Sequence, residues 1–151
     1  MLLKTHVMFG ILMILFFLNH VSSKFLFIGM VLLATVIPDL DSGFSSYGRH
    51  LIFRPLQFFV RHRGVIHSFT TAIVLSGLVA IWFPVASFGF FMGYSVHLIM
   101  DSFTREGIQP FWPLRVKSSG PLLSGGRIEE VLFLGLVVLD ILLFLGVVVL
   151  A

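Results

Sequence analysis

The fold of this chain is decided by one stretch near its middle, residues 85–103, which reads VASFGFFMGYSVHLIMDSF. The stretch is apolar over most of its length and carries no charged residue before Asp101. A helix of about 20 such residues crosses the hydrocarbon core of a bilayer, so the stretch predicts a transmembrane helix. Its two ionisable residues, His97 and Asp101, both stand near its end.

The composition of the whole chain agrees with a membrane location. Of its 151 residues, 58% are hydrophobic and 11% are charged, whereas a soluble domain is about half apolar and a quarter charged. A domain this small cannot hide the excess inside itself, so we expect one membrane-embedded domain over residues 1–151. The net charge of only +3 does not predict a nucleic-acid partner, and the absence of cysteine excludes thiolate metal ligands.

Four further apolar stretches accompany residues 85–103, and they are Leu2–Val21, Phe25–Leu40, Val65–Phe83 and Val131–Ala151. We therefore expect an all-α integral membrane bundle of about five transmembrane helices. Pro38 should end or bend the second helix. The loop Ser42–Gly64 alternates arginine with leucine and phenylalanine, a pattern that predicts a segment lying in the membrane interface.

Five spans put the start of the chain and both long loops on one face of the membrane. Nine of the ten lysine and arginine residues then fall on that face, and only Lys24 falls on the other. Cytoplasmic loops of membrane proteins are enriched in positive residues, so we expect this face to be cytoplasmic and the C-terminus to lie on the opposite side of the inner membrane.

The same face collects most side chains that can bind a metal ion. His97 and Asp101 are four residues apart and share one face of a helix, where an ionisable pair is costly unless it has a function. Asp39 and Asp41 follow Pro38, and two carboxylates this close repel unless a cation lies between them. The alternatives are a buried hydrogen-bonded His97–Asp101 pair and, for the two aspartates, salt bridges to loop arginines.

Further candidates stand at the ends of the other spans. His67 and His6 begin the third and first spans and are candidate ligands, whereas His62 suits a proton donor or a phosphate contact. The glycine-rich residues 124–126 precede Arg127, and free amides at such a turn can bind an anion; ordinary helix capping is the alternative. Glu129 is a candidate ligand or general base, or a favourable charge at a helix N-terminus.

Several of these motifs together resemble the YdjM-like family of membrane-bound metal-dependent hydrolases. They are Thr5-His6, residues 37–41 (IPDLD), residues 62–68 (HRGVIHS) and residues 93–101 (GYSVHLIMD). The family is distantly similar to zinc-dependent phospholipase C and related nucleases. The resemblance implies a metal centre whose ligands are His6, Asp39, Asp41, His67, His97 and Asp101.

On this basis we expect a hydrolase that cleaves a phosphoester, from a lipid or a lipid-linked molecule, at the cytoplasmic membrane face. Two or three zinc ions are expected, with manganese or iron as alternatives that use the same ligand types. Asp39, His67, His62 and Glu129 are the candidate catalytic residues, and Arg61, Arg63 and Arg127 the candidate phosphate contacts. The alternative is a non-enzymatic membrane protein that binds metal, transports it or acts as a scaffold, with membrane lipids as partners in either case.

Overall fold

The computed structural model describes residues 1–41 and 64–150, with side chains at 1–39 and 64–146. The α-helices in this part of the chain are α1 (Leu3–Phe17), α2 (Lys24–Val36), α4 (Phe69–Trp82), α5 (Pro84–Ser102) and α6 (Arg127–Leu150). Two 3-10 segments, η1 (Leu18–His20) and η2 (Ile37–Asp41), extend α1 and α2. The described residues hold no β-strand, which confirms the all-α prediction for them. The predicted interfacial segment falls almost entirely outside these residues.

The helices begin and end where the local chemistry dictates. Pro38 cannot continue an α-helix, and α2 gives way to η2 just before it, as expected. Pro84 occupies the first turn of α5, where its missing N–H costs nothing. The third predicted span is shorter than expected, because Ser68 caps α4 by accepting a hydrogen bond from the Thr71 amide at 3.2 Å. Residues 64–68 therefore form a turn that precedes the helix.

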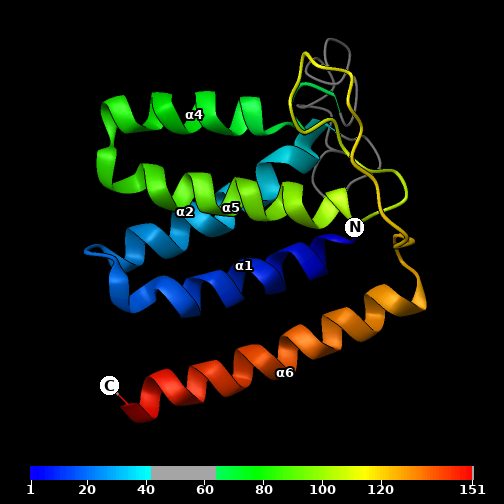
Figure 1. Ribbon diagram of the computed structural model, residues 1–151. Coiled ribbons are helices and arrows are strands. Elements are labelled where there is room, and N and C mark those ends of the chain that lie inside the picture. The colour runs from blue at the N-terminus through cyan, green and yellow to red at the C-terminus, as the bar shows by residue number, and fades with distance from the viewer. Residues whose placement is uncertain (42–63, 151) are drawn as a thin grey trace.

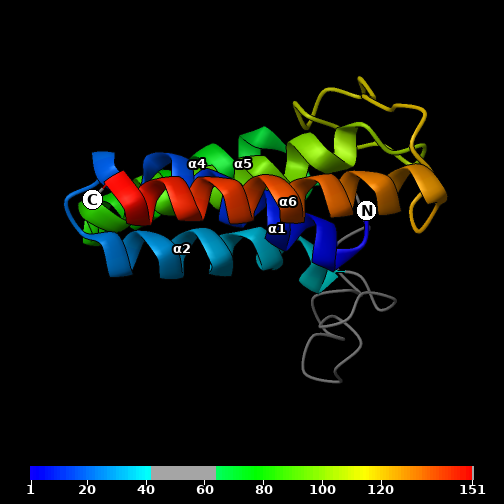
Figure 2. The ribbon, with the colours of Figure 1, turned by 90° about the horizontal axis from the view of Figure 1, so that it is seen from below.

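The helices lie alongside one another and alternate in direction from α1 to α5, and α6 then runs parallel to α1 (Figure 1). Both views place α6 on the outer side of α1 (Figure 2). One end of the bundle therefore collects residues 1–6, 37–41, 64–68, 97–102 and 127–130, and we call it the site end. The opposite end holds the turns at residues 18–23 and 82–84, and we call it the turn end.

The outer surface of the bundle is apolar. Ile73 and Ile81 of α4 and Val138 and Phe144 of α6 are each more than half exposed, which is typical of side chains that face lipid. Among the described residues, one helical segment, Leu3–His20, is long and apolar enough to cross a membrane, and α4 is apolar but shorter. The arrangement as five membrane spans thus stays a prediction.

Helices α2 and α5 pack closely against each other. A Cβ atom at Gly93 would lie 2.2 Å from the carbonyl oxygen of Val31, so only glycine permits this approach. The hydroxyl of Thr35 donates to the Val31 carbonyl at 2.8 Å and lies 3.3 Å from the Gly93 carbonyl. This close approach brings the last turn of α2 beside His97, one turn beyond Gly93 on α5.

Candidate metal centre

Three histidines and two aspartates converge inside the site end of the bundle. Their candidate ligand atoms form two overlapping groups, in each of which all atoms lie within 4.8 Å of one another. The first group is His6, His97 and Asp101, and the second is Asp39, His67 and His97. The three histidines are fully buried and the side chain of Asp101 is 2% exposed. Four segments that are distant in the sequence therefore bring atoms that can bind a metal ion into one buried region.

The separations between these atoms favour a shared cation over direct hydrogen bonds. His97 Nε2 lies 3.8 Å from both Asp39 Oδ1 and Asp101 Oδ2, and His67 Nε2 lies 3.7 Å from Asp101 Oδ2. These distances are too long for side-chain hydrogen bonds. Two atoms bound to one tetrahedral ion at about 2.1 Å are separated by roughly 3.4 Å, which is close to the observed spacing. A directly hydrogen-bonded His97–Asp101 pair, the alternative from the sequence, is not formed.

The orientation of His97 points to the same function. Its Nδ1 lies 2.8 Å from the carbonyl oxygen of Thr35, and because a carbonyl can only accept, Nδ1 carries the proton. Nε2 then faces the two carboxylates, and it has no hydrogen-bond partner among the described residues. A buried nitrogen without a partner is costly, and a metal ion would satisfy it.

Asp101 connects the two ligand groups. Its Oδ1 lies 3.3 Å from His6 Nε2, while its Oδ2 faces His67 and His97. The rings of His6 and His97 are stacked, with centroids 4.0 Å apart. The α-amino nitrogen of Met1 lies 2.5 Å from Asp101 Oδ1 and offsets part of the negative charge. Asp101 therefore lies between the two ligand groups, and its Oδ1 is already in contact with the Met1 α-amino group.

Other predicted site residues stand apart from this centre or outside the described residues. Asp41 ends η2, and its side chain lies outside the described part. Arg61, His62 and Arg63 also fall outside it, so their assigned roles stay predictions. Arg127 is exposed at the start of α6 and belongs to neither ligand group.

Glu129 is buried at the site end, yet its carboxylate is used as a structural anchor. Its Oε1 accepts hydrogen bonds from the Leu2 amide at 2.6 Å and the Thr5 hydroxyl at 2.8 Å. Its Oε2 accepts from the Gly125 amide at 2.6 Å. Because both oxygens are occupied and Glu129 belongs to neither ligand group, this geometry argues against the predicted role as ligand or base. It joins the start of α6 to the first turn of α1, which carries His6.

The same contact changes the interpretation of the glycine-rich turn. Gly125 has a φ of +75°, a conformation that favours glycine. Its amide, which the sequence suggested for an external anion, binds the Glu129 carboxylate one helical turn later. The turn therefore caps the helix, which is the alternative that the sequence left open.

Sequence reasoning missed Thr35, whose backbone rather than side chain orients His97. The carbonyl groups in the last turn of an α-helix lack a partner within the helix. Pro38 stands three residues after Thr35 and predicts the end of α2, so a free carbonyl near Thr35 could have been anticipated. Its partner could not, because α5 is distant in the sequence.

Comparisons with known proteins match this chain to one family. The family model described as YdjM inner membrane protein matches residues 1–150. The chain is 28% identical over 119 residues to proteins named inner membrane protein YdjM from Escherichia coli (strain K12) and Shigella flexneri. The match covers 71% of this chain and 61% of each relative, so the chain spans less than two thirds of their length. No solved structure matches the chain.

Proposed function

Since the chain belongs to the YdjM family of inner membrane proteins, we propose that it is a membrane-embedded, metal-dependent hydrolase that cleaves phosphoesters at the cytoplasmic face. The resemblance noted from the sequence is thereby confirmed at the level of the family, and with it a membrane location. The metal, the reaction and the orientation are our proposal. The observation that carries it is the buried Nε2 of His97, which faces two carboxylates at a spacing suited to a shared ion.

The ions would be held by His6, Asp39, His67, His97 and Asp101, with Asp41 added from the sequence. Each histidine nitrogen binds a single ion, so His97 can complete only one of the two overlapping groups. Asp101 lies between the two groups and would contribute a carboxylate to either. Two or three ions, the number expected from the sequence, remain part of this proposal. Imidazole and carboxylate ligands suit zinc first, and manganese or iron as alternatives.

When bound, such ions activate water for attack on a phosphoester and offset the charge that develops on the phosphate oxygens. The chain itself contributes position and exclusion of water. Thr35 fixes the ring of His97, Glu129 fixes the turn that carries His6, and burial keeps the centre in a low dielectric in which charges interact strongly. Asp39, the most exposed of the five ligands, is the group best placed to orient an incoming water.

The decisive experiment is metal analysis of the protein purified in detergent without a polyhistidine tag. Wild type should retain at least one transition-metal ion per chain, and His97→Ala should lose most of it. His20→Ala is the matched control, because His20 is exposed at the turn end, and it should leave the metal content unchanged. Metal-replete wild type with less than one ion per chain would refute the metal centre.

Turnover separates the hydrolase from its non-enzymatic alternative. Phosphatidyl and isoprenyl-phosphate substrates are incubated with wild type, with His97→Ala and with wild type plus a chelator. Product should form with wild type alone. A protein that binds metal but releases no product from any of these substrates would favour the binding or transport function instead.

A further inference from the structure

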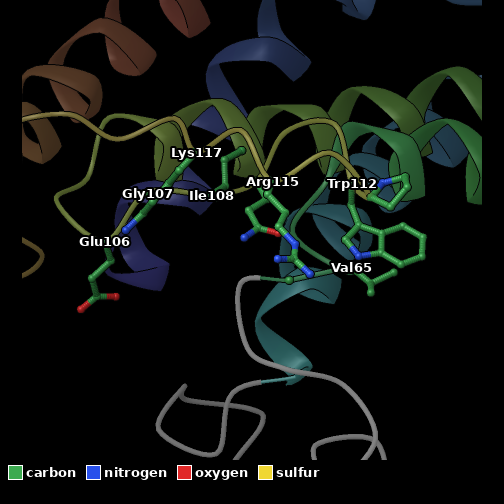
Figure 3. A pocket seen from close by; sticks show the side chains of 10 residues that line it. Val65, Glu106, Gly107, Ile108, Trp112, Arg115 and Lys117 are labelled. Carbon is green, nitrogen blue, oxygen red and sulfur yellow. The ribbon is translucent and has the colours of Figure 1, made fainter.

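A large polar cavity lies at the site end, outside the metal centre. Its volume is about 810 Å³, within the range of small-molecule sites. The loop after α5 provides most of its wall, and the turn before α4 provides the rest. Its lining includes Val65, Gln109, Trp112, Arg115 and Lys117 (Figure 3). None of the five proposed metal ligands lines it.

The cavity carries positive charge beside an aromatic wall. Arg115 and Lys117 are both exposed, so their cationic groups are available to a ligand. Figure 3 shows Arg115 extending toward Val65, near Trp112, whereas Glu106 extends away at the opposite end. Guanidinium and ammonium groups are the side chains that bind phosphate, and tryptophan is enriched where proteins meet lipid headgroups.

The wall of the cavity is held by hydrogen bonds. Ile108 and Ser118 exchange two backbone hydrogen bonds of 2.9 Å, which pairs the two sides of the loop. Ile108 itself is 1% exposed and packs in the core with Tyr94 and Leu98. Gly107 has a φ of +62°, and a Cβ there would lie 2.2 Å from the Ser118 carbonyl oxygen. The cationic side chains therefore extend from an ordered platform, which lowers the entropic cost of binding.

The same wall connects the cavity to the metal centre. Val65 lines the cavity, and His67, two residues later, belongs to the metal centre. The carbonyl of Val65 accepts hydrogen bonds from the hydroxyls of Ser68 at 2.7 Å and Thr71 at 2.6 Å. The Phe69 amide donates to Pro110 at 2.8 Å and ties the start of α4 to the cavity loop. Val65 and His67 are two residues apart, so their Cα atoms lie within about 7 Å of each other and this wall of the cavity adjoins the metal centre.

We propose that this cavity binds a second phosphate group of a lipid substrate, in addition to the phosphate that reacts at the metal centre. This inference rests on the proposed function, because only then is the bound lipid a substrate. It narrows the substrate to lipids with at least two phosphate groups in the headgroup. Arg115 contacts the second phosphate beside Trp112, which covers the headgroup at the membrane surface, and Lys117 adds positive charge from the other end of the cavity.

Binding is measured through Trp112 in a Trp82→Phe background, in which it is the single tryptophan. Trp82 lies at the turn end and is 76% exposed, so its replacement leaves the cavity intact. The protein is treated with chelator to prevent turnover. It is then titrated with micelles of phosphatidylcholine that contain phosphatidic acid or diacylglycerol pyrophosphate, two lipids that differ by one phosphate. The pyrophosphate lipid should bind about tenfold more tightly, as one added charge-assisted contact implies.

Charge variants decide whether the cavity is responsible. Arg115→Gln with Lys117→Gln should abolish the tenfold preference, and Arg115→Lys, which keeps the charge, should retain most of it. The matched control removes two exposed cations elsewhere at the site end, Lys4→Gln with Arg105→Gln, and should keep the preference. Equal effects of the two double variants would overturn the proposal, because they would show general attraction to an anionic surface.

Two further outcomes are informative. Inorganic pyrophosphate that competes as tightly as the lipid would assign the cavity to a soluble phosphate compound and overturn the lipid assignment. Metal content measured on the same variants separates the two proposals. If the cavity prefers the pyrophosphate lipid but the protein as purified, before chelator is added, holds no metal, the hydrolase alone is refuted. Intact metal binding without the preference refutes the cavity alone.

Discussion

Two regions of the bundle bury carboxyl groups, and the surroundings of those groups differ. At the site end, Asp101 and Glu129 are each 1% exposed and lie among histidines, amides and a hydroxyl. In the middle of α6, Asp140 is 7% exposed, and neither of its oxygens has a hydrogen-bond partner among the described residues. Burial of an acid therefore does not identify a site by itself. Convergence of complementary groups from several helices distinguishes the site end.

The largest expected effect comes from removing Asp101, because this acid lies between the two ligand groups of the site end. Asp101→Ala takes away the carboxylate that faces both ligand groups, so the metal content should fall to background. Hydrolysis should fall by about a thousandfold, since a metal ion contributes several kcal/mol to such a reaction. Metal analysis and turnover on the same preparation check this. Full metal occupancy in Asp101→Ala would show that the acids of the site end are not ligands.

An intermediate effect is expected at Glu129. Glu129→Ala leaves the Leu2 and Gly125 amides and the Thr5 hydroxyl without their acceptor, which should lower the free energy of unfolding by about 2–4 kcal/mol. Its neighbour Glu130 is exposed and carries the same charge, so Glu130→Ala is the matched control and should change stability by less than about 0.5 kcal/mol. Thermal unfolding in detergent measures both.

A variant that keeps the shape of Glu129 tests its role. Glu129→Gln retains one acceptor oxygen, so it should be more stable than Glu129→Ala and should bind metal as wild type does. Loss of turnover in Glu129→Gln with full metal content and a native melting temperature would restore the general-base role predicted from the sequence.

The smallest effect is expected at Asp140, where replacing the acid should raise the stability of the protein. A buried carboxyl group without a partner is unfavourable in an apolar region. Asp140→Leu should therefore raise the free energy of unfolding by about 1 kcal/mol and leave metal content and turnover unchanged. A clear loss of stability would show that Asp140 has a partner in the membrane, and the contrast between the two regions would then disappear.

Much of the site can be predicted from hydropathy alone. The apolar stretches define the helices. Because successive helices run in opposite directions, the order of the stretches determines the end of the bundle at which each connecting segment lies. Hydropathy therefore assigns His6, Asp39, His67, His97 and Asp101 to one end of the bundle. The predicted start of α4 is too early, since an apolar run does not reveal that Ser68 caps the helix and leaves His67 in a turn.

The sequence does not predict the direction in which each side chain at that end points. Glu129 and Arg127 open the same helix, and their residue types suggest a part in the reaction for both. The structure turns Glu129 toward the first turn of α1 instead, and its carboxylate meets backbone amides rather than the ligand groups. The rotation of a helix about its axis depends on the neighbours against which it packs, and hydropathy does not specify it.

By itself, the sequence determined the membrane class of the protein and the end of the bundle that gathers its ionisable groups. The physical reason is that apolar segments of sufficient length partition into a bilayer irrespective of their partners. Only the tertiary structure decided which of those groups converge and what orients them. The contact of Gly93 with Val31 places the Thr35 carbonyl against His97, and that contact joins residues on two helices far apart in the chain.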